Sequence, residues 1–228
     1  MAVDCNIDKP IRAVLFDLDG TLLDTAPDLA DALNYVLQLE QRAPLPFEVI
    51  RPAVSNGAAG LMQIGFGASL EEAKSERLRK ELIAFYEENI CNKTTLFDGM
   101  RELLDTLRQR GIIWGIVTNK PAYLTDPLMD QLGLSSLAGC IISGDTTAFS
   151  KPHPEPLFAA CREIDRTPDE CLYVGDAKRD IEAGIRAGMK TIIANYGYIA
   201  SIQATENWGA NGSIEHPEVL LSWLDANS

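Results

Sequence analysis

The chain has 228 residues, with 20 basic and 33 acidic side chains, a formal net charge of −13, and 46% hydrophobic residues. These values are typical of a globular protein and exclude disordered, collagen-like and membrane-spanning classes. So acidic a chain, without a basic cluster, argues against nucleic acid as a partner. A small phosphorylated ligand remains possible, because a local cation can bind it.

The cysteines and the N-terminal residues indicate the compartment. Five cysteines are scattered along the chain without a Cys-x-x-Cys pair, which predicts reduced thiols. Asp4 and Asp8 lie where a signal peptide would be basic and then apolar, and no apolar run approaches the ~18 residues of a membrane span. We therefore expect a cytoplasmic protein, monomeric or homodimeric, without a membrane partner.

The first predicted strand, Ala13–Phe16, is followed by a long helical stretch, because the next predicted strand begins only at Ile112. Apolar stripes predict helices over Pro27–Leu39, Ala58–Ile64 and Leu70–Asn89. Thr25, with Asp28 three residues later, resembles a capping box for the first of these helices.

This stretch predicts two domains. Residues 24–94 would form a helical cap, inserted into a core made of residues 1–23 and 95–228. The alternative is one long crossover packed on the sheet, which the length of the stretch disfavours.

The rest of the chain alternates between strands and helices. Short runs rich in β-branched or aromatic residues predict strands at Ile112–Val117, Cys140–Ile142, Cys171–Val174 and Thr191–Ala194. Helices are predicted over Met100–Gln109, Ala122–Leu132, Pro156–Ile164, Lys178–Ala187 and Pro217–Leu224. This alternation predicts an α/β core, a doubly wound, Rossmann-like parallel sheet with right-handed crossovers.

Acidic residues follow two of the predicted strands. Asp17 and Asp19 come after the first strand, and residues i and i+2 of an extended chain point to the same side, which predicts neighbouring carboxylates. Asp176 and Asp180 follow the fourth strand with helical spacing, which places both on one face. Such a group of carboxylates requires a hard cation such as Mg²⁺, whereas the two histidines lack zinc-ligand spacing.

Anion-binding residues are predicted at the same edge of the sheet. Thr118 and Asn119 follow the second strand, where a hydroxyl and loop N–H groups can bind a phosphate. Lys151 lies before a proline-rich stretch that stiffens its loop. Parallel strands bind ligands at their carboxyl ends, so these groups would meet the Mg²⁺ site there, an arrangement suited to a phosphoryl group.

Four segments, in this order and spacing, resemble the phosphatase branch of the haloacid dehalogenase superfamily. They are Asp17-Leu18-Asp19-Gly20-Thr21, Thr118-Asn119-Lys120, Ser150-Lys151-Pro152 and Gly175-Asp176-Ala177-Lys178-Arg179-Asp180. The resemblance spans essentially the whole chain and implies that the helical insertion is this superfamily's first type of cap. Ala177 departs from the pattern, which often has Ser or Thr after Gly-Asp.

The resemblance implies a Mg²⁺-dependent phosphomonoesterase that forms an aspartyl-phosphate. Asp17 would be the nucleophile, and Asp19 would protonate the leaving oxygen and later deprotonate a water. The implied ligands are Asp17, Asp19 (through its backbone carbonyl) and Asp176 for the metal, with Asp180 behind them, and Thr118, Asn119 and Lys151 for the phosphate.

Within the superfamily, the chain resembles phosphoglycolate phosphatases and, more closely, the N-acetylmuramic acid 6-phosphate phosphatases of peptidoglycan recycling. The segments that carry this resemblance are Phe97-Asp98-Gly99-Met100, Trp114-Gly115-Ile116-Val117-Thr118-Asn119-Lys120-Pro121, Tyr196-Gly197-Tyr198-Ile199 and Asn207-Trp208-Gly209-Ala210. It implies a small phosphorylated metabolite as substrate, N-acetylmuramic acid 6-phosphate before 2-phosphoglycolate. Because first-type caps supply selectivity residues from a loop that opens a helix, Asn56 and Gly57 are candidates for substrate contact.

Other functions use related residues. A haloacid dehalogenase has no need of an acid at Asp19. A phosphosugar mutase would transfer the phosphoryl group to a sugar hydroxyl, and the sequence leaves this alternative open. A non-catalytic phosphate-binding module would be expected to lack at least one of Asp17, Asp19, Lys151 and Asp176, all of which are present.

Overall fold

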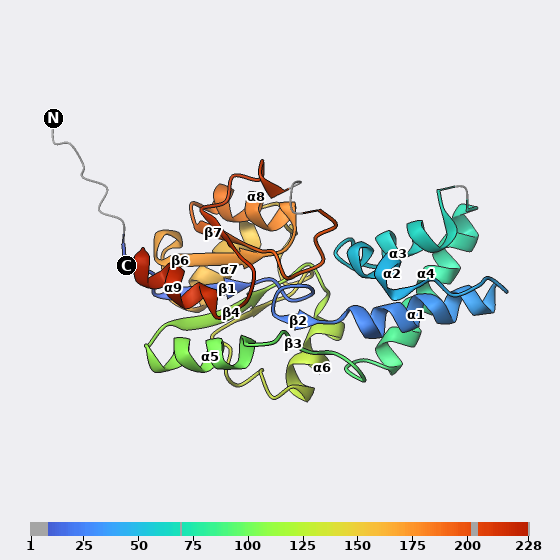
Figure 1. The fold of residues 1–228 in the computed structure, drawn as a ribbon, viewed down its shortest axis with the longest axis horizontal. Coiled ribbons are helices and arrows are strands. Elements are labelled where there is room, and N and C mark those ends of the chain that lie inside the picture. The colour runs from blue at the N-terminus through green and yellow to red at the C-terminus, as the bar shows by residue number, and fades with distance from the viewer. Residues whose placement is uncertain (1–8, 69, 202–204, 228) are drawn as a thin grey trace.

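A parallel sheet of six strands carries the fold (Figure 1). The structure is a computed structural model that describes residues 9–68, 70–201 and 205–227, so Cys5 and the first residues of the predicted core lie outside it. In spatial order the strands are β5 (Ile141–Ile142), β4 (Ile113–Val117), β1 (Ala13–Phe16), β6 (Cys171–Gly175), β7 (Lys190–Ala194) and β8 (Gly212–Ile214). Each neighbouring pair runs parallel.

Helices cover both faces of the sheet because the side chains of its buried strands alternate between them. Val14 and Phe16 of β1 belong to one apolar cluster, and Ala13 and Leu15 to another. The first cluster includes side chains of α5 (Met100–Gln109), α6 (Ala122–Gln131) and α9 (Val219–Ala226), and the second those of α7 (Glu155–Glu163) and α8 (Lys178–Ala187). The predicted doubly wound α/β fold is confirmed.

Four of the helices that follow β1 in the chain lie together at one end of the molecule (Figure 1). They are α1 (Ala26–Leu39), α2 (Phe47–Val54), α3 (Gly57–Phe66) and α4 (Glu72–Glu88). The chain enters this helical insertion through β2 (Leu23–Asp24) and leaves through β3 (Thr95–Leu96), which pair antiparallel. Both connections therefore lie side by side, next to the end of β1.

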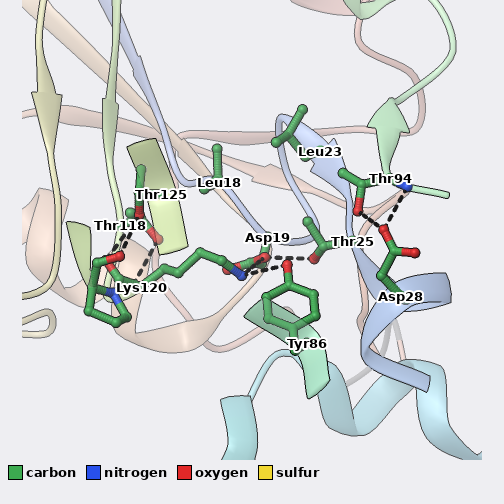
Figure 2. A network of polar contacts seen from close by, with 12 residues as sticks. Leu18, Asp19, Leu23, Thr25, Asp28, Tyr86, Thr94, Thr118, Lys120 and Thr125 are labelled. Atoms are coloured by element: carbon green, nitrogen blue, oxygen red, sulfur yellow. Dashed lines mark hydrogen bonds and ion pairs between the residues drawn. The ribbon is translucent and has the colours of Figure 1, made fainter. Parts of the chain in front are cut away.

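The predicted capping box at the start of α1 is wrong. Thr25 precedes the helix but caps no backbone N–H with its side chain; its hydroxyl instead donates to Asp19 at 2.6 Å. The carboxylate of Asp28 accepts from the backbone N–H groups of Lys93 and Thr94 and from the Thr94 hydroxyl. These bonds tie the start of the insertion to its end (Figure 2).

Some elements were not anticipated. Helix α2 contains Pro52, which lies beyond the first turn and removes one backbone hydrogen bond, so the sequence did not predict a helix there. Strands β2, β3 and β8 are only two or three residues long, and of β8 only Ile214 is buried. Strands this short lack the periodicity from which strands are predicted.

Two further features of the described residues concern the cysteines and the helices. The four cysteines in the described part of the chain, at positions 91, 140, 161 and 171, are free thiols, as predicted. Among the described helices, none combines the length and the apolar character required to cross a bilayer.

Candidate active site

Three adjacent strands carry most of the candidate site residues to one edge of the sheet. Asp17 follows β1, Thr118 follows β4, and Asp176 follows β6. Because β1 lies between β4 and β6, these three strand ends are neighbours in space. This is the edge at which open α/β sheets bind ligands.

Three buried carboxylates form a compact cluster. Oxygen atoms of Asp17, Asp176 and Asp180 all lie within 4.8 Å of one another. Burial, together with the charges of Asp17 and Asp180, raises the pKa of Asp176 to about 8. Burial and Asp17 likewise raise the pKa of Asp180, although Lys151 opposes the shift. The cluster is therefore short of positive charge, and its oxygen donors suit a hard divalent cation such as Mg²⁺.

Lys151 is enclosed by this cluster and by the sheet. Its Nζ lies 2.8 Å from Oδ1 of Asp17 and 2.7 Å from Oδ1 of Asp180. It also donates to the Tyr173 hydroxyl at 2.7 Å and to the Val117 carbonyl at 2.8 Å, and its side chain is 0% exposed. Such complete enclosure fixes the ammonium beside Asp17, where it can neutralise negative charge.

The two oxygens of Asp17 have different surroundings. Oδ1 accepts from the Leu18 N–H at 2.7 Å and contacts Lys151. Among the described residues, no donor contacts Oδ2. One oxygen is thus fixed, and the other keeps its lone pairs for a reaction.

The carboxylate of Asp19 lies outside the compact group that Asp17, Asp176 and Asp180 form. Its Oδ1 accepts from the Thr25 hydroxyl at 2.6 Å and from Lys120 at 3.0 Å (Figure 2). The alternation of an extended strand stops at Leu18, whose carbonyl accepts backbone N–H groups from the turn that follows. The extended geometry behind the i, i+2 prediction therefore ends at Leu18, and the closeness of the Asp17 and Asp19 carboxylates stays a prediction.

A glycine turn brings Asp176 against the loop after β1. Gly20 has a positive φ of +85°, and a Cβ there would collide with Oδ2 of Asp176 and with the ring of Tyr198. The same Oδ2 accepts the Tyr198 N–H at 2.8 Å. Only glycine thus allows the two segments to approach this closely.

Thr118 and Asn119, the two residues after β4, make different hydrogen bonds. The Thr118 hydroxyl accepts the Lys120 N–H at 3.1 Å and retains its own hydrogen for a ligand. The Asn119 side chain binds the backbone of Lys151 in both directions, since it donates to the Lys151 carbonyl at 2.9 Å and accepts its N–H at 3.0 Å. Asn119 therefore holds the Lys151 loop in place beside the candidate phosphate site.

A cavity of about 480 Å³ opens over these residues and lies between the sheet edge and the insertion. Its volume falls within the ~300–1,000 Å³ of small-molecule sites. Asp17, Asp19, Thr118 and Asn119 line it from the core side, and Asn56, Gly57, Arg79 and Tyr86 line it from the insertion. The candidate selectivity residues and the candidate catalytic residues therefore share one cavity.

The insertion also contacts the acidic cluster directly. Ser55 lies in the turn between α2 and α3; its hydroxyl is 3.4 Å from Oδ2 of Asp176, and its carbonyl accepts from Arg179 at 2.6 Å. A hydroxyl thus reaches Asp176 from the insertion although Ala177 offers none.

Some of these side chains escaped the sequence analysis. Lys120 continues the Thr118-Asn119 segment, so its position was a usable signal. Tyr86 belongs to the apolar stripe of α4, and nothing local distinguishes it from a core residue. Neither Ser55 nor Arg179 carries a local signal of its contact with the other.

The fold and this strand-end arrangement define a haloacid dehalogenase-type hydrolase, and a family comparison agrees. The model of the haloacid dehalogenase-like hydrolase family matches residues 14–194. The chain belongs to this family, as the motifs predicted.

Individual relatives identify the branch. The chain is 39% identical over 215 residues to an N-acetylmuramic acid 6-phosphate phosphatase of Pseudomonas aeruginosa, covering 94% of this chain and 95% of that protein. It is 41% identical over 209 residues to a phosphoglycolate phosphatase of Xanthomonas campestris, covering 92% and 94%. A crystal structure of a predicted phosphoglycolate phosphatase from Haemophilus somnus superposes with a TM-score of 0.83 at 28% identity, covering 93% and 97%. The predicted enzyme class, a phosphatase, is thereby confirmed.

Proposed function

We propose that the protein is a Mg²⁺-dependent phosphomonoesterase that acts through an aspartyl-phosphate on Asp17. One observation carries the proposal: Asp17, which lines the cavity, has one oxygen fixed by Lys151 and the Leu18 N–H, and its other oxygen meets no donor among the residues that the structure describes. A nucleophile for an in-line attack requires this combination of a fixed position and a free lone pair.

The reaction has two displacements. In the first, Oδ2 of Asp17 forms a bond to phosphorus as the bond to the leaving oxygen breaks, and Asp19 gives that oxygen a proton. In the second, Asp19 takes a proton from water, the water oxygen attacks phosphorus, and inorganic phosphate leaves Asp17 as a free carboxylate. Lys151 and the Thr118 hydroxyl stabilise the phosphoryl oxygens in both.

Asp17, Asp176 and the backbone carbonyl of Asp19 would hold the Mg²⁺, with Asp180 behind them on Lys151. The buried cluster of carboxylate oxygens and the raised pKa of Asp176 support the assignment of Mg²⁺ to these residues, since a cation would compensate the surplus negative charge. When bound, the ion supplies neutralising charge to the transferred phosphoryl group.

Residues 24–94 would act as a cap that supplies the substrate-binding wall. N-acetylmuramic acid 6-phosphate is the favoured substrate. The names of the Pseudomonas relatives support it, as does a cavity whose wall includes the apolar side chains of Leu29, Leu82, Ile83 and Leu124. 2-Phosphoglycolate is the second candidate because of the Xanthomonas relatives. Both are small phosphorylated molecules, and we place their hydrolysis in the cytoplasm, which the free cysteines support.

A phosphate-release screen over small phosphomonoesters, with and without Mg²⁺, tests the proposal. We expect Mg²⁺-dependent release from N-acetylmuramic acid 6-phosphate, and a loss of at least about 10⁴-fold in kcat for Asp17→Asn. Exposed Asp126→Asn is the matched control. Retention of a tenth of the activity by Asp17→Asn would refute the aspartyl-phosphate, and isomerisation of a hexose 1-phosphate without phosphate release would favour a mutase.

A further inference from the structure

The ammonium of Lys120 joins the sheet edge to helix α4 of the insertion (Figure 2). Its Nζ lies 3.0 Å from Oδ1 of Asp19 and 3.0 Å from the hydroxyl oxygen of Tyr86. It also lies 4.6 Å from the centre of the Tyr86 ring, and its side chain is only 7% exposed. The mechanism above uses neither Lys120 nor Tyr86.

Asp19 is held by one oxygen only. Thr25 and Lys120 both donate to Oδ1, and across the part of the chain that the structure describes no donor contacts Oδ2. Two donors occupy the lone pairs of Oδ1, so a proton carried by Asp19 resides on Oδ2. Because Asp19 lines the cavity, Oδ2 is the oxygen that remains for a leaving group.

Tyr86 determines where the Lys120 ammonium lies. A lysine has a flexible four-carbon stem, so its charge needs a second contact to stay in one place. Burial raises the pKa of Tyr86 to about 12, which keeps its hydroxyl neutral. The neutral Tyr86 hydroxyl accepts a hydrogen bond from the Lys120 ammonium and does not neutralise its charge. The positive charge therefore acts on the Asp19 carboxylate.

We propose that Lys120 is a positioning residue for proton transfer by Asp19, and that Tyr86 makes this positioning depend on the placement of helix α4. The inference rests on the proposed role of Asp19 as the acid. The proton moves from Oδ2 of Asp19 to the leaving oxygen as its bond to phosphorus breaks, and Lys120 keeps all its protons. Proton transfer is thereby coupled to contact between the insertion and the core.

Substituted phenyl phosphates test the inference, because their leaving groups differ in basicity while the rest of the molecule is nearly constant. A poorly basic p-nitrophenolate leaves without a proton, whereas phenolate benefits from one. We expect Lys120→Met to lower kcat/KM about 100-fold for phenyl phosphate and less than about 10-fold for p-nitrophenyl phosphate. kcat/KM reports the first displacement alone, so hydrolysis of the aspartyl-phosphate does not affect the comparison.

Three variants complete the experiment. Asp19→Asn is the reference for a lost acid and should show the same dependence on the leaving group. Tyr86→Phe keeps the ammonium and the ring beside it but removes the hydroxyl contact, and should show a smaller loss with the same dependence. Lys80→Met, at an exposed lysine of α4, is the matched control and should equal the wild type.

The outcomes separate the two proposals. A uniform loss in Lys120→Met, beside a leaving-group-dependent loss in Asp19→Asn, would overturn the inference and leave the proposed function intact. A uniform loss in Asp19→Asn would reject its role as the acid, and the inference with it. If Lys120→Met does not fold, Tyr86→Phe decides the question by the same criterion.

Discussion

The ammonium of Lys151 lies 2.7 Å from Oδ1 of Asp180, and both side chains are fully excluded from solvent. Asp180 uses its other oxygen on the Ala177 N–H, at 3.0 Å, so its two oxygens serve two different donors. Asp180 therefore connects the first turn of α8 to the lysine that contacts Asp17.

Asp180→Asn should lower both stability and activity. An amide has only one acceptor oxygen, so either Lys151 or the Ala177 N–H loses its partner, which costs about 1–3 kcal/mol for a buried donor. We expect this decrease in the free energy of unfolding in urea, and a lower kcat with Lys151 misplaced. Asp126→Asn, at an exposed position, should change neither. Unchanged stability and kcat in Asp180→Asn would show that the buried contact with Lys151 has no such role.

Mg²⁺ should stabilise the folded protein in the absence of substrate. The ion would compensate the charge shared by Asp17, Asp176 and Asp180, and at about 100 times its Kd it adds about 2.7 kcal/mol. For a chain of this size that raises Tm by about 5–11 °C. Differential scanning fluorimetry after EDTA treatment measures the shift, and Asp176→Asn should reduce it strongly. A Tm that does not respond to Mg²⁺ in the wild type would contradict a metal site at this cluster.

The metal-free protein should lose stability as the pH rises. Burial and the charges of Asp17 and Asp180 raise the pKa of Asp176 to about 8, so the folded protein retains a proton that the unfolded chain releases near pH 4. The contribution of this proton is complete below about pH 4 and disappears as the pH rises towards 8.

Urea unfolding in EDTA, between about pH 5 and pH 8, measures this effect. As the pH rises, the wild type should lose stability relative to Asp176→Asn, because the amide has no proton to lose. The difference in the free energy of unfolding between the two proteins should change by up to about 1.4 kcal/mol per pH unit. A difference between the two proteins that stays constant with pH would show that Asp176 does not titrate in this range.

Asn56→Ala should change substrate preference rather than catalysis. Asn56 is exposed at the start of α3, caps no backbone group with its side chain, and lines the cavity. Its amide is therefore available to a substrate. We expect kcat/KM for N-acetylmuramic acid 6-phosphate to fall about 10–200-fold relative to 2-phosphoglycolate, with little change on an aryl phosphate. An equal loss on all three substrates would assign the loop to folding or closure.

The sequence by itself was sufficient to predict five of the six strands of the sheet and most of the residues at its edge. Buried strands such as Ala13–Phe16 and Cys171–Gly175 are continuous apolar runs, and a parallel sheet brings their carboxyl ends together whatever the details of the helices. The places of Asp17, Asp176, Thr118 and Lys151 follow from that rule and from motif spacing.

Only the tertiary structure decided how these side chains are partnered. After the turn at Leu18, the Asp19 carboxylate binds Thr25 and Lys120 and lies outside the group of Asp17, Asp176 and Asp180, which local periodicity does not encode because it ends where the strand ends. Asn119 holds the Lys151 loop, and Tyr86 reaches Lys120 from another part of the chain. Contacts of this kind join residues far apart in sequence, so no local pattern encodes them; they arise from the packing of the insertion and loops against the sheet.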